Sequence, residues 1–286
     1  MSLHKAICQK CKREFDTISY VVKWCEKCKV IRYQERAKDY RRRKLKGQVK
    51  PNPCTKYRVI NEEFFDTWSP EMAWVLGFFF ADGNLSQVNN KLRIEFSSKD
   101  RDVLEQVRTL LQTDYKIGCR SKIMNGKKLV WHQLVIPNQK IAKRVLELGG
   151  IERKSLVLVF PNVPDKYVSH LVRGFFDGDG SIWINNVEGI WSERLNLRFD
   201  SASKIAVEWL YDQVKSFANI ERRISNDHGT FYFALSTGQA LRICEWMYKD
   251  TTETSRLKRK FDIYSDFVSR LTEARKHYTY RSQRAD

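Results

Sequence analysis

Two stretches of this chain alternate between apolar and polar residues with a period of two, about one hundred positions apart. They read KLRIEFS at residues 91–97 and RLNLRFD at residues 194–200. Alternation with this period is typical of a β-strand that buries one face and exposes the other. An offset of 105 positions superposes Arg93 on Arg198 and Glu95 on Asp200. The two stretches therefore predict equivalent half-buried strands in two related parts of the chain.

Each predicted strand is followed by an amphipathic segment, a hairpin signal and a second amphipathic segment. In the first part, we predict a helix at about residues 101–112, strands near 116–124 and 128–136 joined by Asn125-Gly126, and a helix at about 139–148. In the second part, we predict a helix at about 204–217, strands near 221–225 and 230–235 joined through residues 226–229, and a helix at about 239–248. Asn-Gly is a strong signal for a hairpin turn.

A short motif precedes each of these parts and occurs twice with the same spacing. It reads VLGFFFADG at residues 75–83 and VRGFFDGDG at residues 172–180. Ser69-Pro70 and Pro164-Asp165 are helix-start signals, so we predict helices at about 70–81 and 165–177 that end at the following glycines. Gly77 and Gly174 fall inside these helices, where glycine costs about 1 kcal/mol relative to alanine. That cost is tolerable if the two backbones approach closely there.

The predicted elements give the fold class and the domain organisation. Each part reads helix, two strands, helix, two strands, helix, so the main fold is α+β, with two pseudo-symmetric αββαββα halves and antiparallel sheets. We expect a module at residues 1–46, a linker at 47–60, and the two halves at 61–163 and 164–286. No apolar run approaches the ~18 residues of a membrane span, and the N-terminus lacks a signal peptide's apolar core. We therefore expect a cytoplasmic, nucleoid or organelle-matrix protein that is not secreted and has no membrane partner.

Charge points to the class of partner. The chain has 52 Lys and Arg against 34 Asp and Glu, a formal net charge of +18. Residues 1–60 hold 18 of the basic residues and only 5 of the acidic ones. A positive excess of this size favours a polyanion, and nucleic acid is the favoured one. The alternative explanation for the positive excess in residues 1–60 is a solvated basic tail.

Four cysteines near the N-terminus form two CxxC pairs separated by thirteen residues: Cys8, Cys11, Cys25 and Cys28. Two such pairs suit tetrahedral thiolate coordination of structural Zn²⁺, whose binding also supplies folding energy to a small module. Four ordinary thiols are the alternative. The segment KVIRYQERAKDYRRRKLK then predicts a basic helix, and we expect its Arg41, Arg42 and Arg43 to neutralise phosphates.

Two acidic residues occupy equivalent positions in the repeated motif. Asp82 and Asp179 are 97 positions apart, and each stands at the end of a predicted helix. Two carboxylates brought together by pseudo-symmetry form a divalent-metal site, and Mg²⁺ prefers such hard oxygen ligands. A single copy of the motif would be equally well explained as a buried helix ending in an Asp-Gly turn.

The polar faces of the predicted sheets offer candidate contacts to DNA. A two-stranded ribbon fits the major groove, and arginine pairs with guanine edges. The candidate base or phosphate contacts are Arg93, Glu95, Arg120, Lys122, Lys128, Arg198, Asp200 and Arg223. For any single member, an ordinary solvated sheet face is the alternative explanation.

From about residue 61 to residue 272, the chain resembles the LAGLIDADG homing endonucleases in their single-chain, two-motif form. The resemblance depends on AWVLGFFFADGNL and HLVRGFFDGDGSI, with support from KLRIEFSSKD, LGGIERKS and RLKRKF. The family often has an earlier acid in the motif. Asp177 matches that acid, whereas Phe80 departs from it. The four-cysteine module and the basic helix lie outside the resemblance.

The resemblance implies an arrangement and an activity. The two motif helices would pack side by side, so that Asp82 and Asp179 converge on two or more Mg²⁺ ions between two sheets that form a saddle along duplex DNA. Lys154 and Lys260 match the basic residues expected near the metal, with Lys258 as a rival to Lys260. The implied protein is an intron-encoded, monomeric endonuclease that cuts both strands at a long asymmetric site.

Two classes of function remain open on the sequence. The first is a site-specific, metal-dependent double-strand DNA endonuclease, in which Asp82, Asp179, Lys154 and Lys260 are catalytic. The second is a non-catalytic nucleic-acid-binding protein on the same scaffold, either a splicing helper for intron RNA or a transcriptional regulator. A pure binder needs neither the paired acids nor the paired lysines, so their presence favours the enzyme. A self-splicing intein is disfavoured, because the chain lacks the terminal residues that such chemistry uses.

Overall fold

The structure is a computed structural model that describes residues 3–18, 22–48, 58–124, 126–150, 158–186, 193–218, 220 and 223–282. It separates into two compact units, Met1–Tyr57 and Arg58–Asp286, each of which is described by itself. Lys154 and Asn125 lie outside the described residues. Within the described parts, no helix combines the length and the apolar character that a membrane crossing requires.

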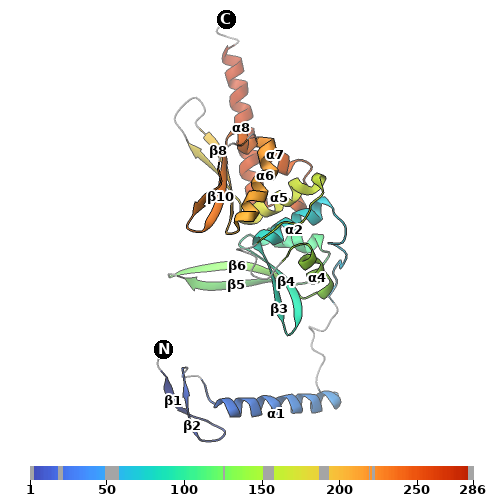
Figure 1. The fold of residues 1–286 in the computed structure, drawn as a ribbon, viewed down its shortest axis with the longest axis vertical. Coiled ribbons are helices and arrows are strands. Elements are labelled where there is room, and N and C mark those ends of the chain that lie inside the picture. Colours follow the sequence, from blue (N-terminus) through green and yellow to red (C-terminus); the bar gives the residue numbers. More distant parts are fainter. Residues whose placement is uncertain are drawn as a thin grey trace. The chain divides into compact units, whose positions relative to one another are not determined.

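The N-terminal unit consists of a small hairpin and one long helix (Figure 1). Strands β1 (His4–Ile7) and β2 (Glu14–Thr17) pair in antiparallel fashion, and α1 (Glu26–Leu45) begins between the last two cysteines of the CxxC pairs. The α1 sequence contains neither Gly nor Pro and is rich in helix formers. The predicted basic helix is confirmed, whereas the hairpin was not predicted because each strand has only four residues.

The repeated motifs form the two predicted helices, α2 (Pro70–Asp82) and α5 (Asp165–Asp179). The Ser69 side chain accepts a hydrogen bond from the Met72 amide at 3.1 Å, and Pro70 occupies the first helical turn. Both helices continue to the motif aspartate, slightly beyond the predicted ends. The amides of Gly83 and Gly180 then donate to the carbonyls of Phe79 and Phe176, which closes each last turn. The sequence repeat therefore places Asp82 and Asp179 at equivalent helix ends.

The two motif helices pack against each other through backbone contact. A Cβ atom added at Gly77 would lie 2.0 Å from the carbonyl oxygen of Leu171, and one at Gly174 would lie 2.0 Å from that of Trp74. The contacts are reciprocal, because Trp74 and Leu171 are themselves equivalent positions of the repeat. Glycine is required at both positions because any side chain would force the helices apart. The helix pair lies where the two halves of the second unit meet (Figure 1).

Each half contains a four-stranded antiparallel sheet with the same strand order. The first sheet runs β3-β4-β6-β5 and the second β7-β8-β10-β9. The strands are β3 (Gly83–Val88), β4 (Lys91–Ser98), β5 (Ile117–Met124), β6 (Lys127–Ile136), β7 (Ser181–Asn186), β8 (Glu193–Ser201), β9 (Ser225–Asp227) and β10 (Thr230–Ser236). The helices after the motif helices are α3 (Arg101–Leu110), α4 (Gln139–Glu147), α6 (Lys204–Ala218), α7 (Gly238–Tyr248) and α8 (Lys258–Ser282), with a short 3-10 turn η3 (Glu253–Ser255). The predicted α+β fold with two similar halves is therefore confirmed.

The alternating strands bury the face that their sequence predicts. Ile94 and Phe96 of β4 are buried, as are Leu195, Leu197 and Phe199 of β8. These side chains join one apolar core that also includes the motif helices of both halves. Because the core is continuous across the helix pair, the polar faces of both sheets are held in fixed positions relative to Asp82 and Asp179.

Two features differ from the prediction. Strand β9 begins only at Ser225, and its turn lies at His228 and Gly229, both at positive φ, so the hairpin is tighter than predicted. The β5–β6 ribbon is longer than its counterpart, as the predicted strands indicated, with strands of 8 and 10 residues against 3 and 7. Helix α8 was not predicted. It follows the second repeat, and the described residues that follow the first repeat contain no counterpart, so the repeat pattern could not indicate it.

Candidate functional site

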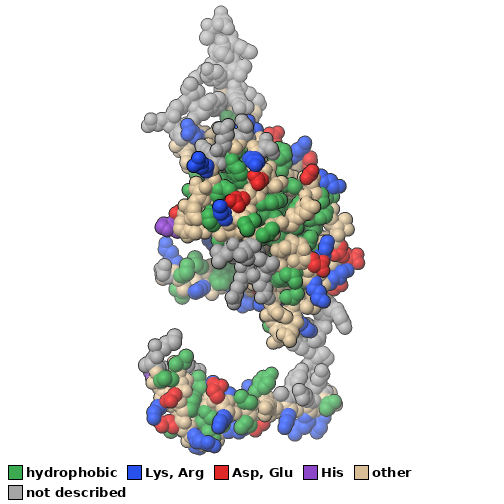
Figure 2. Space-filling model, viewed as in Figure 1, with side chains coloured by type: hydrophobic (Ala, Val, Ile, Leu, Met, Phe, Trp, Pro, Cys, Tyr) green, Lys and Arg blue, Asp and Glu red, His purple; other side chains and the backbone are tan. Residues whose placement is uncertain are grey.

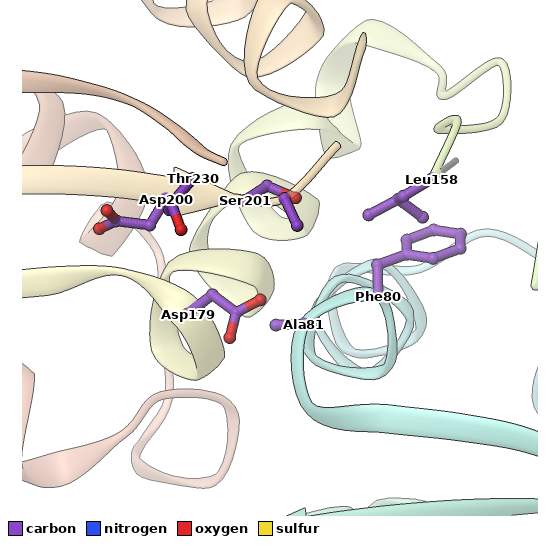
Figure 3. Close-up of a pocket in the computed structure, with 8 residues that line it drawn as sticks. Phe80, Ala81, Leu158, Asp179, Asp200, Ser201 and Thr230 are labelled. Carbon is purple, nitrogen blue, oxygen red and sulfur yellow. The ribbon is translucent and has the colours of Figure 1, made fainter. Parts of the chain in front are cut away.

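The structure brings the carboxyl ends of the two motif helices together. A Cβ atom added at Gly178 would lie 3.4 Å from Oδ2 of Asp82 and 2.3 Å from the Cβ of Ala81, so Asp82 adjoins the last turn of α5. Figure 3 shows the Asp179 carboxylate pointing across the junction toward Ala81. Helix carboxyl ends carry partial negative charge, which adds to that of the two carboxylates. The junction therefore carries strong negative charge, to which both halves contribute.

Lys260, near the start of α8, lies at this junction but is buried. Its ammonium group donates hydrogen bonds to backbone carbonyls of the last turn of α5, at 2.5 Å to Phe176, 3.0 Å to Asp177 and 2.5 Å to Gly180. An ammonium group has three hydrogens. These contacts therefore engage its full donor capacity. Lys258 is instead exposed and paired with Asp262, so the structure places Lys260, rather than its rival, at the helix end.

The electrostatic coupling at Lys260 includes both motif aspartates. Burial lowers the Lys260 pKa from 10.5 to about 8, because desolvation disfavours the charged form. Asp177 opposes this change most strongly, and Asp82 and Asp179 also oppose it. Lys260 therefore provides a positive charge that acts on both carboxylates from beneath the junction.

Asp177, the earlier acid of the second motif, points into the protein. It is 2% exposed, and its Oδ2 accepts hydrogen bonds of 2.9 Å from the Trp74 indole Nε1 and from the Leu257 amide. Burial raises its pKa, and the opposing charge of Lys260 is the largest counter-effect. Trp74 belongs to the first half, so this hydrogen bond crosses the junction. Sequence reasoning matched Asp177 to the motif but could not show its direction or its partner.

A pocket of about 260 Å³ opens beside Asp179 in the second half (Figure 3). Its lining includes Ala81 from the first half and Asp179, Asp200 and Thr230 from the second. The Asp200 carboxylate turns away from Asp179 (Figure 3) and pairs with Arg198 at 2.5 Å. The polar face of the second sheet thus continues into the junction.

Hydrogen bonds connect several side chains on the polar face of the first sheet. Gln133 Nε2 donates to Glu95 at 2.5 Å, and Arg120 Nε donates to the Gln133 side-chain oxygen at 3.2 Å. Arg93 Nε donates to Ser86 at 3.0 Å. Sequence reasoning missed Gln133, although its polar position between Trp131 and Val135 on one face was a usable signal. The predicted contacts Arg93, Glu95 and Arg120 therefore share one ordered surface.

On the second sheet, Arg198 is held by two neighbours. Besides its ion pair with Asp200, its guanidinium lies 3.6 Å from the centre of the Tyr232 ring. Cation–π stacking of this kind fixes the orientation of the guanidinium plane. Sequence reasoning missed Tyr232. Arg223 is exposed two residues before β9.

The strand register places two of the predicted DNA contacts, Lys122 and Lys128, on opposite faces of the β5–β6 ribbon. Lys122 pairs with Leu129 across the β5–β6 ribbon, whereas Lys128 pairs with Ile123. Because side chains alternate along a strand, Lys122 shares the face of Arg120, and Lys128 lies on the opposite face. The expectation that Lys128 extends the same polar face is therefore wrong. Periodicity alone could not fix the register of this ribbon, because both of its faces are exposed near the turn.

In the N-terminal unit, the four predicted cysteines converge. One ligand atom from each of Cys8, Cys11, Cys25 and Cys28 lies within 4.8 Å of the others, and the Cys11 and Cys25 sulfurs are 3.8 Å apart. A tetrahedral zinc site with Zn–S bonds of about 2.3 Å has sulfur atoms roughly 3.8 Å apart. Desolvation and the other three cysteines raise the pKa of Cys28 to about 12, whereas hydrogen bonds within the cluster outweigh desolvation at Cys8 and lower its pKa to about 6. A cation among the sulfurs would stabilise the thiolate form of all four residues, so the donor set and its spacing fit zinc.

Lys and Arg side chains recur along α1 (Figure 2). Arg42 forms an ion pair of 2.7 Å with Asp39, and Lys10 reaches Glu35 at 2.6 Å, so acidic neighbours neutralise part of the basic excess. Arg43 is exposed, and the backbone of Arg41 lies in the helix. The predicted phosphate-binding arginines thus occupy the last turn and a half of α1.

Comparison with known proteins identifies part of the second unit. Residues 69–150 match a protein-family model described as a LAGLIDADG-like domain. A search of curated proteins finds no match. That matched segment includes α2, the whole first sheet, α3 and α4.

Solved structures with similar folds include two DNA-bound endonucleases and one further protein. The homing endonuclease I-WcaI, bound to its DNA recognition sequence, is 13% identical with a TM-score of 0.48, over 77% of this chain and 96% of that one. The LAGLIDADG meganuclease I-CpaMI, bound to uncleaved DNA, is 17% identical with a TM-score of 0.47, over 76% and 96%. WhiA from Thermatoga maritima is 15% identical with a TM-score of 0.43, over 78% and 71%. The family match and the repeated architecture together show that this chain carries a LAGLIDADG-like domain at residues 69–150, followed by a second half of the same fold.

Proposed function

We propose that the protein is a metal-dependent endonuclease that cuts both strands of duplex DNA at a long, asymmetric site. The observation that supports this most directly is the junction itself. The end of α2 with Asp82 adjoins the end of α5 with Asp179, between two sheets whose polar faces carry arginines. Since one chain supplies both carboxylates, the active form is a monomer. Its place of action is inside the cell, where the DNA is.

Asp82 and Asp179 would hold two or more Mg²⁺ ions at the junction. The residues fit this group, because two carboxylates at the negative ends of helices form a hard, anionic donor set. When bound, the metal ions lower the pKa of water and neutralise charge on the scissile phosphate, which phosphodiester hydrolysis requires.

The lysines have a distinct role in this proposal. Lys260 keeps the last turn of α5 closed through its carbonyl contacts and sets a positive charge beneath the phosphate position. We assign the equivalent role in the first half to Lys154, on the basis of its motif. Positive charge fixed in this way before reaction would stabilise the extra negative charge of the transition state.

The two sheet faces would recognise the target. Arg93, Glu95, Arg120 and Lys122 would contact one half-site, and Arg198, Asp200 and Arg223 the other, with arginine reading guanine where it reaches a base edge. The side chains of the two faces differ, so the two half-sites should differ in sequence. Lys128, on the opposite face of its ribbon, would contact a backbone phosphate instead.

The N-terminal unit would contribute affinity rather than sequence preference. Zn²⁺ held by Cys8, Cys11, Cys25 and Cys28 would fold the module, and Arg41, Arg42 and Arg43 of α1 would neutralise phosphates. This surface is equally suited to the phosphates of RNA, which makes intron RNA a second partner to test.

A randomised duplex library tests the proposal. The full chain is incubated with the library and Mg²⁺, and the cut ends are sequenced. Enrichment of one long asymmetric site is the expected result, and Asp82→Asn and Asp179→Asn should still bind that site without cutting it. Specific binding with no cut ends from the native chain would refute the nuclease assignment and favour a non-catalytic regulator or splicing helper.

A further inference from the structure

Apolar side chains are exposed along the β5–β6 ribbon, which projects beyond the rest of the first sheet (Figure 1). Ile117 and Leu134 belong to the core or pack against it at the base of the ribbon, whereas every described residue from 118 to 130 is exposed. Four of the exposed residues have large apolar side chains, with exposed fractions of 75% at Ile123, 50% at Met124, 43% at Val130 and 38% at Leu129. Exposed apolar side chains on a two-stranded ribbon promote aggregation unless a partner covers them. We call the described residues from 121 to 130 the ribbon tip.

Two of the four apolar side chains lie on the face that continues the core side of the sheet. Ile123 pairs with Lys128, and Ser121 pairs with Val130. Because paired residues point to the same face, Ile123 and Val130 are diagonal neighbours there, with Lys128 beside them. We call this face the far face of the ribbon tip.

The other two apolar side chains lie on the opposite face, which also carries Arg120. Lys122 pairs with Leu129, and Met124 pairs with Lys127, so Met124 and Leu129 are diagonal neighbours between two lysines. We call this face the near face. Each face of the ribbon tip therefore combines two apolar side chains with lysine, and a partner that covered one face alone would leave the other exposed.

The charge of the ribbon indicates the kind of partner. Residues 116–136 contain five Lys and Arg and no Asp or Glu. Two such ribbons would repel each other, which disfavours a second copy of this chain as the partner. Duplex DNA offers a dense row of phosphates and a groove with two walls. Duplex DNA therefore matches both the charge of the ribbon and its two apolar faces.

The major groove of DNA matches the ribbon tip in size and in chemistry. The groove is about 12 Å wide, and a sheet with side chains on both faces is about 10 Å thick, which is the spacing at which sheets pack. Phosphates border the groove on both sides, where lysines of either face can contact them. Apolar side chains cannot donate or accept hydrogen bonds at a base edge. Among the base edges in this groove, thymine alone presents a methyl group, which apolar side chains can contact.

We propose that the ribbon tip lies in the major groove with both faces against the DNA and selects thymine through its methyl group. Ile123 and Val130 make these contacts from the far face, and Met124 and Leu129 make them from the near face. This inference rests on the proposed binding of duplex DNA, and it is independent of cleavage.

The second half of the unit provides an internal comparison. Phe233 and Leu235 of β10 are buried, and Phe231 packs against the core. The large apolar side chains of this strand therefore contribute to the core instead of to an exposed ribbon. Thymine selection by this mechanism is expected only in the half-site that contacts the first sheet.

Deoxyuridine substitution tests the methyl contact, because it removes only the methyl group of thymine. The full chain first selects a site from a randomised duplex library by binding alone, without Mg²⁺. Replacement of the thymines in one half-site by deoxyuridine should weaken binding about fourfold for each methyl group lost, which is the effect of one buried apolar carbon. The same replacement in the other half-site should leave the affinity unchanged.

Serine variants of each face locate the contact. Ile123→Ser on the far face and Leu129→Ser on the near face should each weaken binding to the selected site and reduce the response to deoxyuridine. Both side chains are exposed, so these substitutions leave the core intact. The matched control is Leu146→Ser on α4, where the side chain is 43% exposed. This control should bind and respond as the native chain does.

The outcomes separate this inference from the proposed function. Native binding that deoxyuridine leaves unchanged in both half-sites would overturn thymine selection, and a response that Leu129→Ser alone alters would overturn contact by both faces. Self-association of the native chain that Ile123→Ser abolishes in sedimentation would assign the ribbon tip to a second copy instead. If the chain binds with the expected response but cuts no DNA, the nuclease assignment fails and thymine selection stands. Cleavage without the response would refute thymine selection alone.

Discussion

Replacement of Gly77 by alanine tests the packing that creates the junction. The new Cβ would lie 2.0 Å from the Leu171 carbonyl oxygen and 2.9 Å from the Phe175 amide nitrogen. Both are backbone atoms, so no side-chain rotation can relieve the contact. Real Cβ contacts are essentially never under 3.0 Å, so the helices must separate by about 1 Å.

The cost of this separation should lie at the upper end of the range for overpacking, about 3 kcal/mol. For a unit of this size, each kcal/mol lowers the melting temperature by about 2–4 °C, so a drop of about 6–12 °C is expected. Gly238→Ala is the control, because its Cβ would meet no atom within 4 Å and its φ is not positive. It should leave stability unchanged or raise it slightly.

The double variant sharpens the test. Gly77 and Gly174 contact opposite helices at the same crossing, so a single separation relieves both clashes. The free energies of unfolding, measured by urea titration of the two single variants and the double variant, should therefore be less than additive by about 1 kcal/mol or more. Additive losses would refute the shared contact. A melting temperature of Gly77→Ala equal to that of Gly238→Ala would refute the close packing itself.

Three further predictions concern the charges and the metals. Asp82→Asn and Asp179→Asn should each retain DNA affinity in a gel-shift assay while losing plasmid linearisation, and linearisation by either variant would contradict the shared site. For Lys260, the folded pKa of about 8 lies below the ordinary 10.5, so the unfolded chain binds more protons between these values and stability should rise with pH there. In the metal-free native protein, the free energy of unfolding measured by urea titration should be up to about 3 kcal/mol higher at pH 10.5 than at pH 7.5. This difference should be absent in Lys260→Met. The cysteine cluster should bind one zinc ion. Chelation or Cys25→Ser should abolish both the thiolate-to-cobalt absorption of Co²⁺-substituted protein and the helical signal of α1. Unchanged absorption and helical spectra would contradict the zinc site.

Much of this fold could be predicted from local patterns. The repeated motif indicated two equivalent helices, because glycine, aromatic pair, aspartate and glycine recur at the same offsets. The alternating residues of β4 and β8 indicated the buried face of each sheet, and the two CxxC pairs indicated converging thiols. These features depend on the chemistry of neighbours a few positions apart, which the sequence states directly.

The direction of buried polar groups depended on contacts that no local pattern records. Asp177 and Asp179 are two positions apart, yet one points to the Trp74 indole inside the protein and the other toward the junction. Lys260 matched a basic position of the family, but its partners are carbonyl groups about eighty residues earlier in the chain.

The sequence by itself determined the repeat, the type and order of most elements, and the residues capable of the chemistry. Only the tertiary structure decided that Lys128 faces away from Lys122, that Gln133 and Tyr232 order the neighbouring arginines, and that Lys260 contacts the carbonyl groups at the end of α5. The physical reason is that a charge or hydrogen bond is set by atoms within a few ångströms in space. Chain neighbours supply only some of those atoms, whereas packing between distant segments supplies the rest.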